Sequence, residues 1–239
     1  NLYTGSSTNL QVLITILGTW ILCPIIAGVI AMGLFTFTKR VILNRKLHIL
    51  RLDAYTRTAL LLAGAFGAYS LGANNIANVM GVFVPISPFT DVTIGNLFVF
   101  SSKEQLFLLG GLAIAVGVFT YSKRVMFTVG NDLLKMTPVA AFIVVISHSI
   151  VLFLFASQGI SAFLQSINLP SIPLVPVSSS QAVVGGVIGI GLLKGGKEVQ
   201  WSIAGRISLG WMTLPIIAAL ISLIVLFILE NIFNLTVSF

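Results

Sequence analysis

Three asparagines, Asn74, Asn75 and Asn78, lie close together inside an otherwise apolar stretch of the chain. Each amide carries hydrogen-bond donors and an acceptor, and burying an amide without partners costs roughly 2–7 kcal/mol. Amides at this spacing can bind a polar solute or an ion by replacing its water. Gly72 and Gly81 bracket them, and we interpret these glycines as points of close backbone approach. The pattern predicts an interrupted helix with a solute or ion site near the middle of a membrane.

A second candidate segment joins prolines to a run of polar side chains. The prolines between residues 170 and 176 prevent a regular helix there. The polar residues that follow are Ser178, Ser179, Ser180 and Gln181. We expect them at the start of a new helix, where free N–H groups and the positive dipole end bind anions. N-capping explains one serine but not three serines and a glutamine. Gly185 and the glycines after it predict close packing against another backbone.

The composition indicates where these segments must lie. Hydrophobic residues make up 57% of the chain and charged residues 8%, and the mean hydropathy is +1.07. A soluble domain of 239 residues could not cover its surface with so few charges. Apolar runs near or above the ~20 residues needed to cross a bilayer occupy 10–37, 58–86, 105–122, 138–157, 174–193 and 202–233. We therefore expect an all-α integral membrane protein with several spans and interrupted or re-entrant helices.

Basic residues cluster between the apolar runs and predict the orientation. Six lysines and arginines share the connector 39–57 with one acid, Asp53. By the positive-inside rule, we expect the basic loops 39–57, 123–135 and 194–200 to be cytoplasmic in a cell membrane. Residues 87–104 and 158–172 would then lie outside, with both termini. The net charge of +7 thus indicates membrane topology, and we expect no nucleic-acid partner.

An internal repeat is visible around two tryptophans. Trp20 and Trp211 are each followed, after three residues, by Pro-Ile-Ile-Ala. We interpret residues 1–38 as the last helix of a first repeat, 39–57 as a linker, and 58–239 as a second repeat in a transporter built from inverted repeats. Roughly 120–160 further residues upstream are then expected to complete the first repeat and its half of the site. The alternative is chance similarity between two apolar helices.

The two polar motifs together resemble the inorganic phosphate transporter family. That family carries a repeated Gly-Ala-Asn-Asp-Val-Ala-Asn-type motif and, after it, a Pro-Val-Ser-Thr-Thr-His-type motif; here they stand at 72–78 and 176–181. The resemblance covers about residues 58–230, with 10–37 similar to the end of the N-terminal half. It implies a symporter of inorganic phosphate, coupled to Na⁺ or H⁺, that works by alternating access. It also implies a substrate site at Asn74, Asn75, Asn78, Ser178, Ser179, Ser180 and Gln181, with sodium near Asn75 and Asn78. Because each motif alone leaves polar groups unsatisfied in an apolar setting, we expect the side chains of Asn74 and Asn78 to converge in space with those of Ser178 to Gln181.

Two departures from the family pattern leave the substrate open. Asn75 stands at the family's Asp position and Gln181 at its His position, so each loses a titratable group. An amide is a weaker cation ligand than a carboxylate. Hydrogen phosphate needs an acceptor for its proton, whereas sulfate needs only donors, and amides supply both. A sulfate permease of the same family and an uncoupled anion channel or facilitator remain alternatives.

Two ionisable residues inside apolar runs are candidates for coupling or charge balance. His148 lies within 138–157 and Arg206 near the start of the last run, where ionisable groups are often functional. The alternatives are a neutral histidine bonded to a neighbouring helix and an arginine that reaches the interface. The chain has no metal-protease motif, and its apolar runs contain no pair of carboxylates. The sequence therefore gives no indication of an enzyme. The expected partners are the lipid bilayer, phosphate or sulfate, the missing N-terminal repeat and, as a candidate, a second copy; no cofactor is expected beyond the coupling ion.

Overall fold

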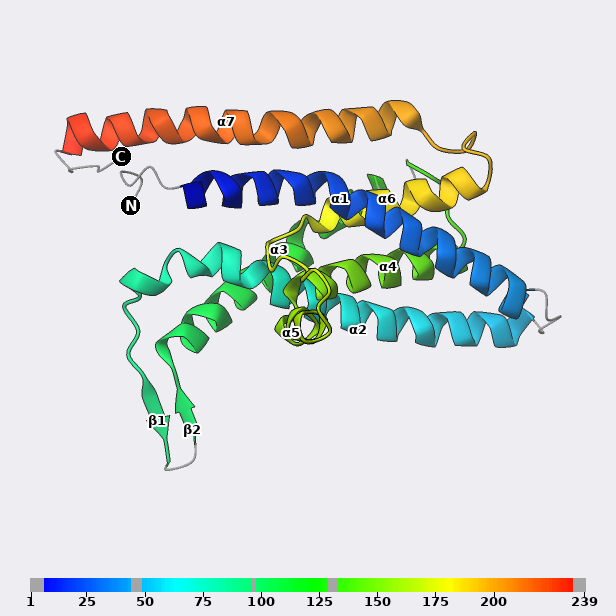
Figure 1. Cartoon of the computed structure of the whole chain (residues 1–239), viewed down its shortest axis with the longest axis horizontal. Coiled ribbons are helices and arrows are strands. Elements are labelled where there is room, and N and C mark those ends of the chain that lie inside the picture. Colours follow the sequence, from blue (N-terminus) through cyan, green and yellow to red (C-terminus); the bar gives the residue numbers. More distant parts are fainter. Residues whose placement is uncertain (1–6, 44–48, 96–97, 129–132, 234–239) are drawn as a thin grey trace. The chain divides into compact units, whose positions relative to one another are not determined.

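The computed structural model describes residues 7–43, 49–95, 98–128 and 133–233, and in this part the chain is predominantly helical (Figure 1). The order of elements is α1 (Ser7–Thr38), η1 (Lys39–Leu43), α2 (Ile49–Gly81), η2 (Val84–Ile86), β1 (Val92–Ile94), β2 (Phe98–Phe100), α3 (Ser102–Phe127), α4 (Pro138–Ala156), α5 (Gln158–Ser166), α6 (Ser179–Leu193) and α7 (Trp201–Phe233). The expected helical membrane protein is confirmed.

Four described helices are long and apolar enough to cross a membrane. They are Ile14–Val41, Ser102–Lys123, Pro138–Ala156 and Trp201–Ile232, each within a few residues of an expected run. α2 is long enough, at 33 residues or about 50 Å, but its charged start and its asparagines lower its hydropathy. α6 has only 15 residues. The expected span 174–193 is therefore corrected, because the proline-rich chain before Ser179 is not helical.

The predicted helix interruption at 72–78 is wrong. α2 is continuous from Ile49 to Gly81. A glycine inside a helix costs only about 1 kcal/mol, and Asn75 Nδ2 donates to the Leu71 carbonyl of the same helix at 3.3 Å. The basic connector is also shorter than expected. Lys39–Leu43 forms a π-helix and residues 49–57 already belong to α2, where Arg57 and Asp53 form an exposed ion pair at 2.9 Å.

The segment 87–104 contains two strands that the sequence did not predict. β1 and β2 pair antiparallel, with Thr93 opposite Val99, at the end of an arm between α2 and α3 (Figure 1). The amide of Gln105 donates to the carbonyls of Thr90 at 2.7 Å and Phe100 at 3.0 Å. This side chain ties both sides of the arm to the start of α3. The segment 158–172 likewise contains a short helix, α5.

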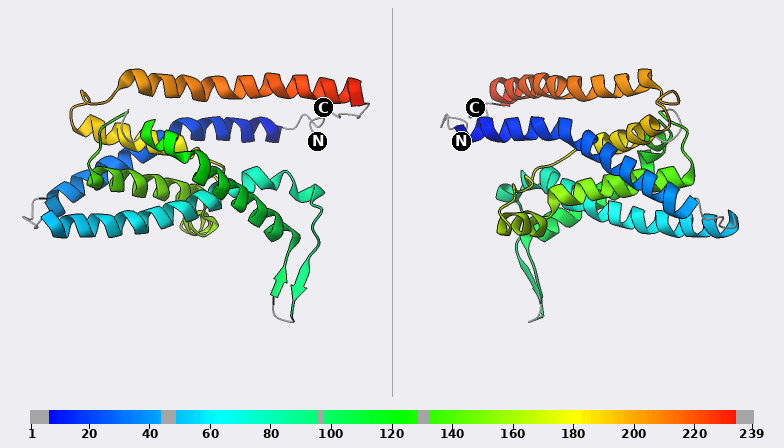
Figure 2. Two further views of the ribbon diagram at one scale, coloured as in Figure 1. Left: turned by 180° about the vertical axis from the view of Figure 1, so that it is seen from behind. Right: turned by 45° about the vertical axis from the view of Figure 1, so that its right-hand side comes forward.

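The chain divides into two compact units, residues 14–199 and residues 1–13 with 200–239. In the second of these, α7 is a continuous helix that contains Pro215. In residues 14–199, α4 packs against α2 and α6, and Figure 2 shows α2 and α4 side by side. The ring of Phe153 on α4 lies 5.6 Å from that of Phe66 and 6.4 Å from that of Tyr69, both on α2.

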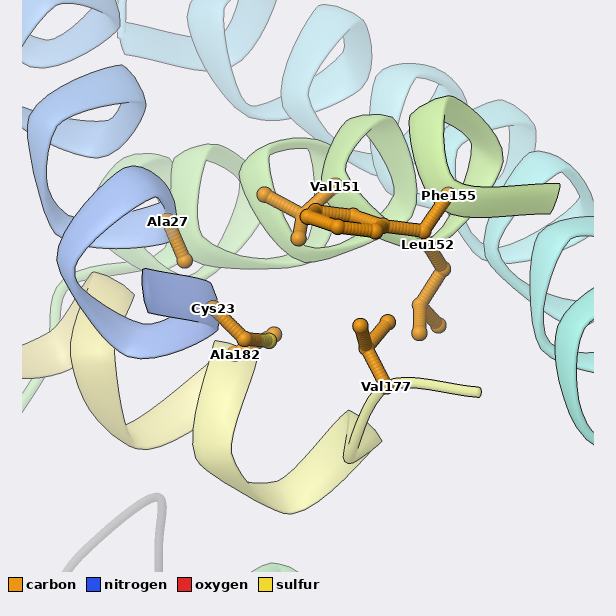
Figure 3. Close-up of a cluster of buried hydrophobic side chains, with 7 residues drawn as sticks. All are labelled: Cys23, Ala27, Val151, Leu152, Phe155, Val177 and Ala182. Atoms are coloured by element: carbon orange, nitrogen blue, oxygen red, sulfur yellow. The ribbon is translucent and has the colours of Figure 1, made fainter. Parts of the chain in front are cut away.

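A buried cluster joins α1, α4 and the start of α6. Its members are Cys23, Ala27, Val151, Leu152, Phe155, Val177 and Ala182, and Figure 3 shows them converging from the three helices and the chain before α6. Small residues on α1 and α6 allow these helices to approach closely, which favours van der Waals packing within a membrane. The cluster fixes the position of the chain that enters α6.

Candidate functional site

Ser178 is the N-cap of α6, and a new helix begins at the serines as the sequence predicted. The backbone of Ser178 is extended, and its side-chain oxygen accepts from the Gln181 N–H at 3.4 Å. The Ser178 carbonyl accepts the first regular helix bond, from Ala182 N at 3.1 Å. Helix geometry leaves the N–H groups of Ser179 and Ser180 without an intrahelical acceptor. Two backbone donors and the positive end of the helix dipole therefore suit an anion here.

Asn74 connects the two polar motifs. Its side-chain oxygen accepts from the backbone N–H of Val177 at 3.0 Å, across 103 residues of sequence. The Asn74 side chain is 6% exposed and Val177 is 2% exposed, so water does not compete for this bond. The predicted convergence of the motifs is thus observed at Asn74, although it joins a side chain to the backbone just before the serines. Asn74 positions the entry to α6.

The other two asparagines are placed differently. Asn75 is half-buried and donates within its own helix, so the structure does not join it to the serines. The side chain of Asn78 lies outside the described residues. Of the glycines beside them, Gly72 and Gly81 are open, because a methyl group added to either would meet nothing within 4 Å. The close backbone approach expected at these two glycines is therefore not observed.

His148 on α4 contacts the first residue of α6. Its Nε2 lies 2.9 Å from Ser179 Oγ, and the side chain is 9% exposed. The sequence marked His148 as the one ionisable residue of its apolar span, but it did not reveal this partner. The bond brings a third helix to the serine motif. Whether the Ser179 hydroxyl donates or accepts in this bond depends on which ring nitrogen of His148 carries the proton.

Gln181 is the buried member of the serine motif. It is 6% exposed, and its side-chain oxygen has no hydrogen-bond partner among the described residues. Leaving a buried acceptor unsatisfied costs about 1–3 kcal/mol. An amide oxygen in this state can accept from a proton-bearing ligand or coordinate a cation.

α1 holds the start of α6 through small residues. The thiol of Cys23 donates to the Ser178 carbonyl, with 3.6 Å between sulfur and oxygen. Further along α6, a methyl group on Gly185 would collide with the backbone of Pro24, and one on Gly189 would collide with that of Gly28. The close approach expected at Gly185 is thus present. Sequence reasoning missed Cys23, since its apolar setting is the same as that of an ordinary packing residue.

Arg206, the other charged candidate, lies on α7 in the separate unit of the chain and is exposed. Within the described ranges there is no group of three or more His, Cys, Asp or Glu side chains that could hold a metal ion. The polar groups gathered at α6 are hydroxyls, amides, backbone N–H groups and one histidine.

Known proteins share sequence with most of this chain. A model of the phosphate transporter family matches residues 48–222 and 167–237. The protein named "putative phosphate permease" in Methanocaldococcus jannaschii is 30% identical over 92% of this chain and 62% of its own length. Human sodium-dependent phosphate transporter 1 is 28% identical over 65% of this chain and 21% of its own.

A solved structure, "The sodium-dependent phosphate transporter", shares the fold, with a TM-score of 0.60 at 19% identity. The match covers 86% of this chain and 63% of that one. The chain thus spans less than two thirds of the length of these relatives. Their names describe transporters and permeases, in agreement with the expectation that the chain is not an enzyme. The family match covers most of the sequence, and the chain belongs to the phosphate transporter family.

Proposed function

We propose that this chain forms part of a secondary active transporter of inorganic phosphate, with the anion bound at the start of α6. The observation that carries the proposal is the buried bond from Val177 N–H to Asn74 Oδ1. It holds the two motifs together and leaves the first turn of α6 open to a ligand. Ser178 and Ser179 are half-buried there and Ser180 is exposed, so an anion can reach their donors.

The site offers donors without a formal positive charge. The N–H groups of Ser179 and Ser180 and the hydroxyl groups of the serines can replace water around phosphate oxygens. They cannot neutralise the charge of the anion, so a coupling cation is needed for tight binding in a low-dielectric setting. The human relative is named as sodium-dependent, and we propose Na⁺ in the same role here.

The residues fit sodium through amide oxygens rather than carboxylates. The unpaired, buried oxygen of Gln181 suits a hard cation, which prefers oxygen ligands. Asn75 and Asn78 are the other amides that we propose for it. When bound, the ion would offset the negative charge of phosphate. Weaker ligation by amides would make sodium affinity lower than with a carboxylate at position 75.

Alternating access requires a second repeat that moves against the first. We propose that residues 1–38 end one repeat, 39–57 link the two, and 58–239 form the other. In support, α1 and α7 are both long helices that contain a proline, Pro24 and Pro215, four residues after a tryptophan. We also propose that the protein lies in the cell membrane with its basic loops in the cytoplasm, and that it forms a homodimer.

Uptake into liposomes tests the function directly. We expect the complete transporter that contains this chain, when reconstituted, to accumulate labelled phosphate against its gradient when Na⁺ is higher outside, and to stop doing so when the Na⁺ gradient is collapsed. An imposed proton gradient serves as the comparison. Equilibration without accumulation would instead indicate a channel or facilitator, and accumulation of sulfate but not phosphate would indicate a sulfate permease.

Replacing Asn75 with aspartate tests whether this position lies near the coupling ion. With Na⁺ nearby, the new carboxylate should lower the sodium concentration that supports half-maximal phosphate uptake. Without Na⁺ nearby, it should weaken anion binding by like-charge repulsion. The measurement is the sodium dependence of uptake and the phosphate-to-sulfate ratio at fixed sodium. If Asn75→Asp leaves both unchanged, Asn75 is not part of the site.

A further inference from the structure

The contact between His148 and Ser179 has a direction that matters for the ligand. The two atoms, His148 Nε2 and Ser179 Oγ, are 2.9 Å apart, and either can supply the shared proton. A neutral imidazole has one N–H nitrogen and one acceptor nitrogen, and with its proton on Nδ1 the ring accepts at Nε2.

We propose that His148 is a positioning residue that takes the Ser179 hydroxyl proton and so presents the Ser179 oxygen as an acceptor to the bound anion. This inference rests on the proposed function and concerns its substrate choice. An acceptor at this position favours an oxyanion that carries a proton. Near neutral pH phosphate carries at least one proton, whereas sulfate carries none. The pair therefore favours hydrogen phosphate over sulfate.

The rest of the first turn of α6 is consistent with this role. The free N–H groups of Ser179 and Ser180 donate to unprotonated oxygens, which both anions possess, so they do not discriminate. A site whose acceptor needs a ligand's proton rejects an analogue without it. The Asn75 and Gln181 departures then do not by themselves make the site a sulfate site.

The test compares the phosphate KM with the sulfate concentration that half-inhibits phosphate uptake in liposomes. In His148→Phe, the Ser179 hydroxyl is free to donate to sulfate. We expect the preference for phosphate to fall about five- to tenfold, the effect of one hydrogen bond. In His148→Gln, the amide oxygen can accept the Ser179 proton again, and we expect most of the preference to return. Ser147→Ala is the control, because the hydroxyl of this buried neighbour bonds, within the described part of the chain, only to the Ile143 carbonyl of its own helix at 2.6 Å.

Ser179→Ala keeps the test decisive if His148→Phe does not fold. Removing the hydroxyl should weaken phosphate uptake and leave sulfate inhibition nearly unchanged. In the Ser179→Ala background, a change at His148 should no longer alter the preference. Equal losses for both anions in either single variant would overturn the inference and leave His148 a structural residue. Failure of the complete wild-type transporter to transport phosphate would overturn the proposed function instead.

Discussion

Replacing Asn74 with leucine should lower phosphate uptake by roughly a hundredfold while the protein still inserts into the membrane. Leucine has nearly the shape of asparagine but no acceptor, so the buried Val177 N–H loses the partner that lies 3.0 Å away. An unsatisfied buried donor costs about 1–3 kcal/mol, and the chain before α6 will shift to find another acceptor. A shift of about 1 Å in positioned groups can cost about a hundredfold in rate.

A matched control for this variant lies one turn earlier on α2. Ser70 is also fully buried, but its hydroxyl donates to Phe66 within the helix, at 2.8 Å. Ser70→Ala should therefore keep near wild-type uptake and melting temperature. Uptake and thermal unfolding in detergent, measured on both variants, separate positioning from general stability. If Asn74→Leu transports as well as Ser70→Ala, the bond between the motifs is incidental to transport.

The meeting of the two motifs could be predicted from sequence, but the way they meet could not. Buried amides and hydroxyls need partners, and two such groups in an apolar chain satisfy each other best. This argument does not specify atoms. It predicted side chains facing each other, whereas Asn74 binds the backbone of Val177. It also predicted a broken helix, although α2 tolerates its glycines and asparagines without a break because the cost of each is small.

Contacts that depend on the relative rotation of helices could not be predicted from the sequence. His148 could be singled out as ionisable, but its bond to Ser179 depends on how α4 packs against α6. The strands β1 and β2 are only three residues each, too short for a period-2 pattern to be recognised. Glycines show the same limit. Gly185 and Gly72 look alike in the sequence, yet only Gly185 faces another backbone.

Gly185→Ala should strongly destabilise the protein, although it adds a single methyl group. The new carbon would collide with the backbone of Pro24 on α1, and backbone cannot move aside as a flexible side chain can. Forcing extra volume into a packed contact costs about 1–3 kcal/mol and sometimes more. Separating α1 from α6 would also break the contact between the Cys23 thiol and the Ser178 carbonyl. We therefore expect a lower melting temperature and a loss of phosphate uptake together.

Gly64→Ala on α2 is the matched control for the same change of residue. Nothing lies within 4 Å of its added carbon, and alanine is favoured over glycine inside a helix by about 1 kcal/mol. Its melting temperature should equal or slightly exceed that of the wild type. Gly189→Ala, which would meet the backbone of Gly28, should instead behave like Gly185→Ala. If Gly185→Ala and Gly189→Ala have the same melting temperature as Gly64→Ala, α1 and α6 are not closely packed in the membrane. In that case α1 does not hold the start of α6 in place.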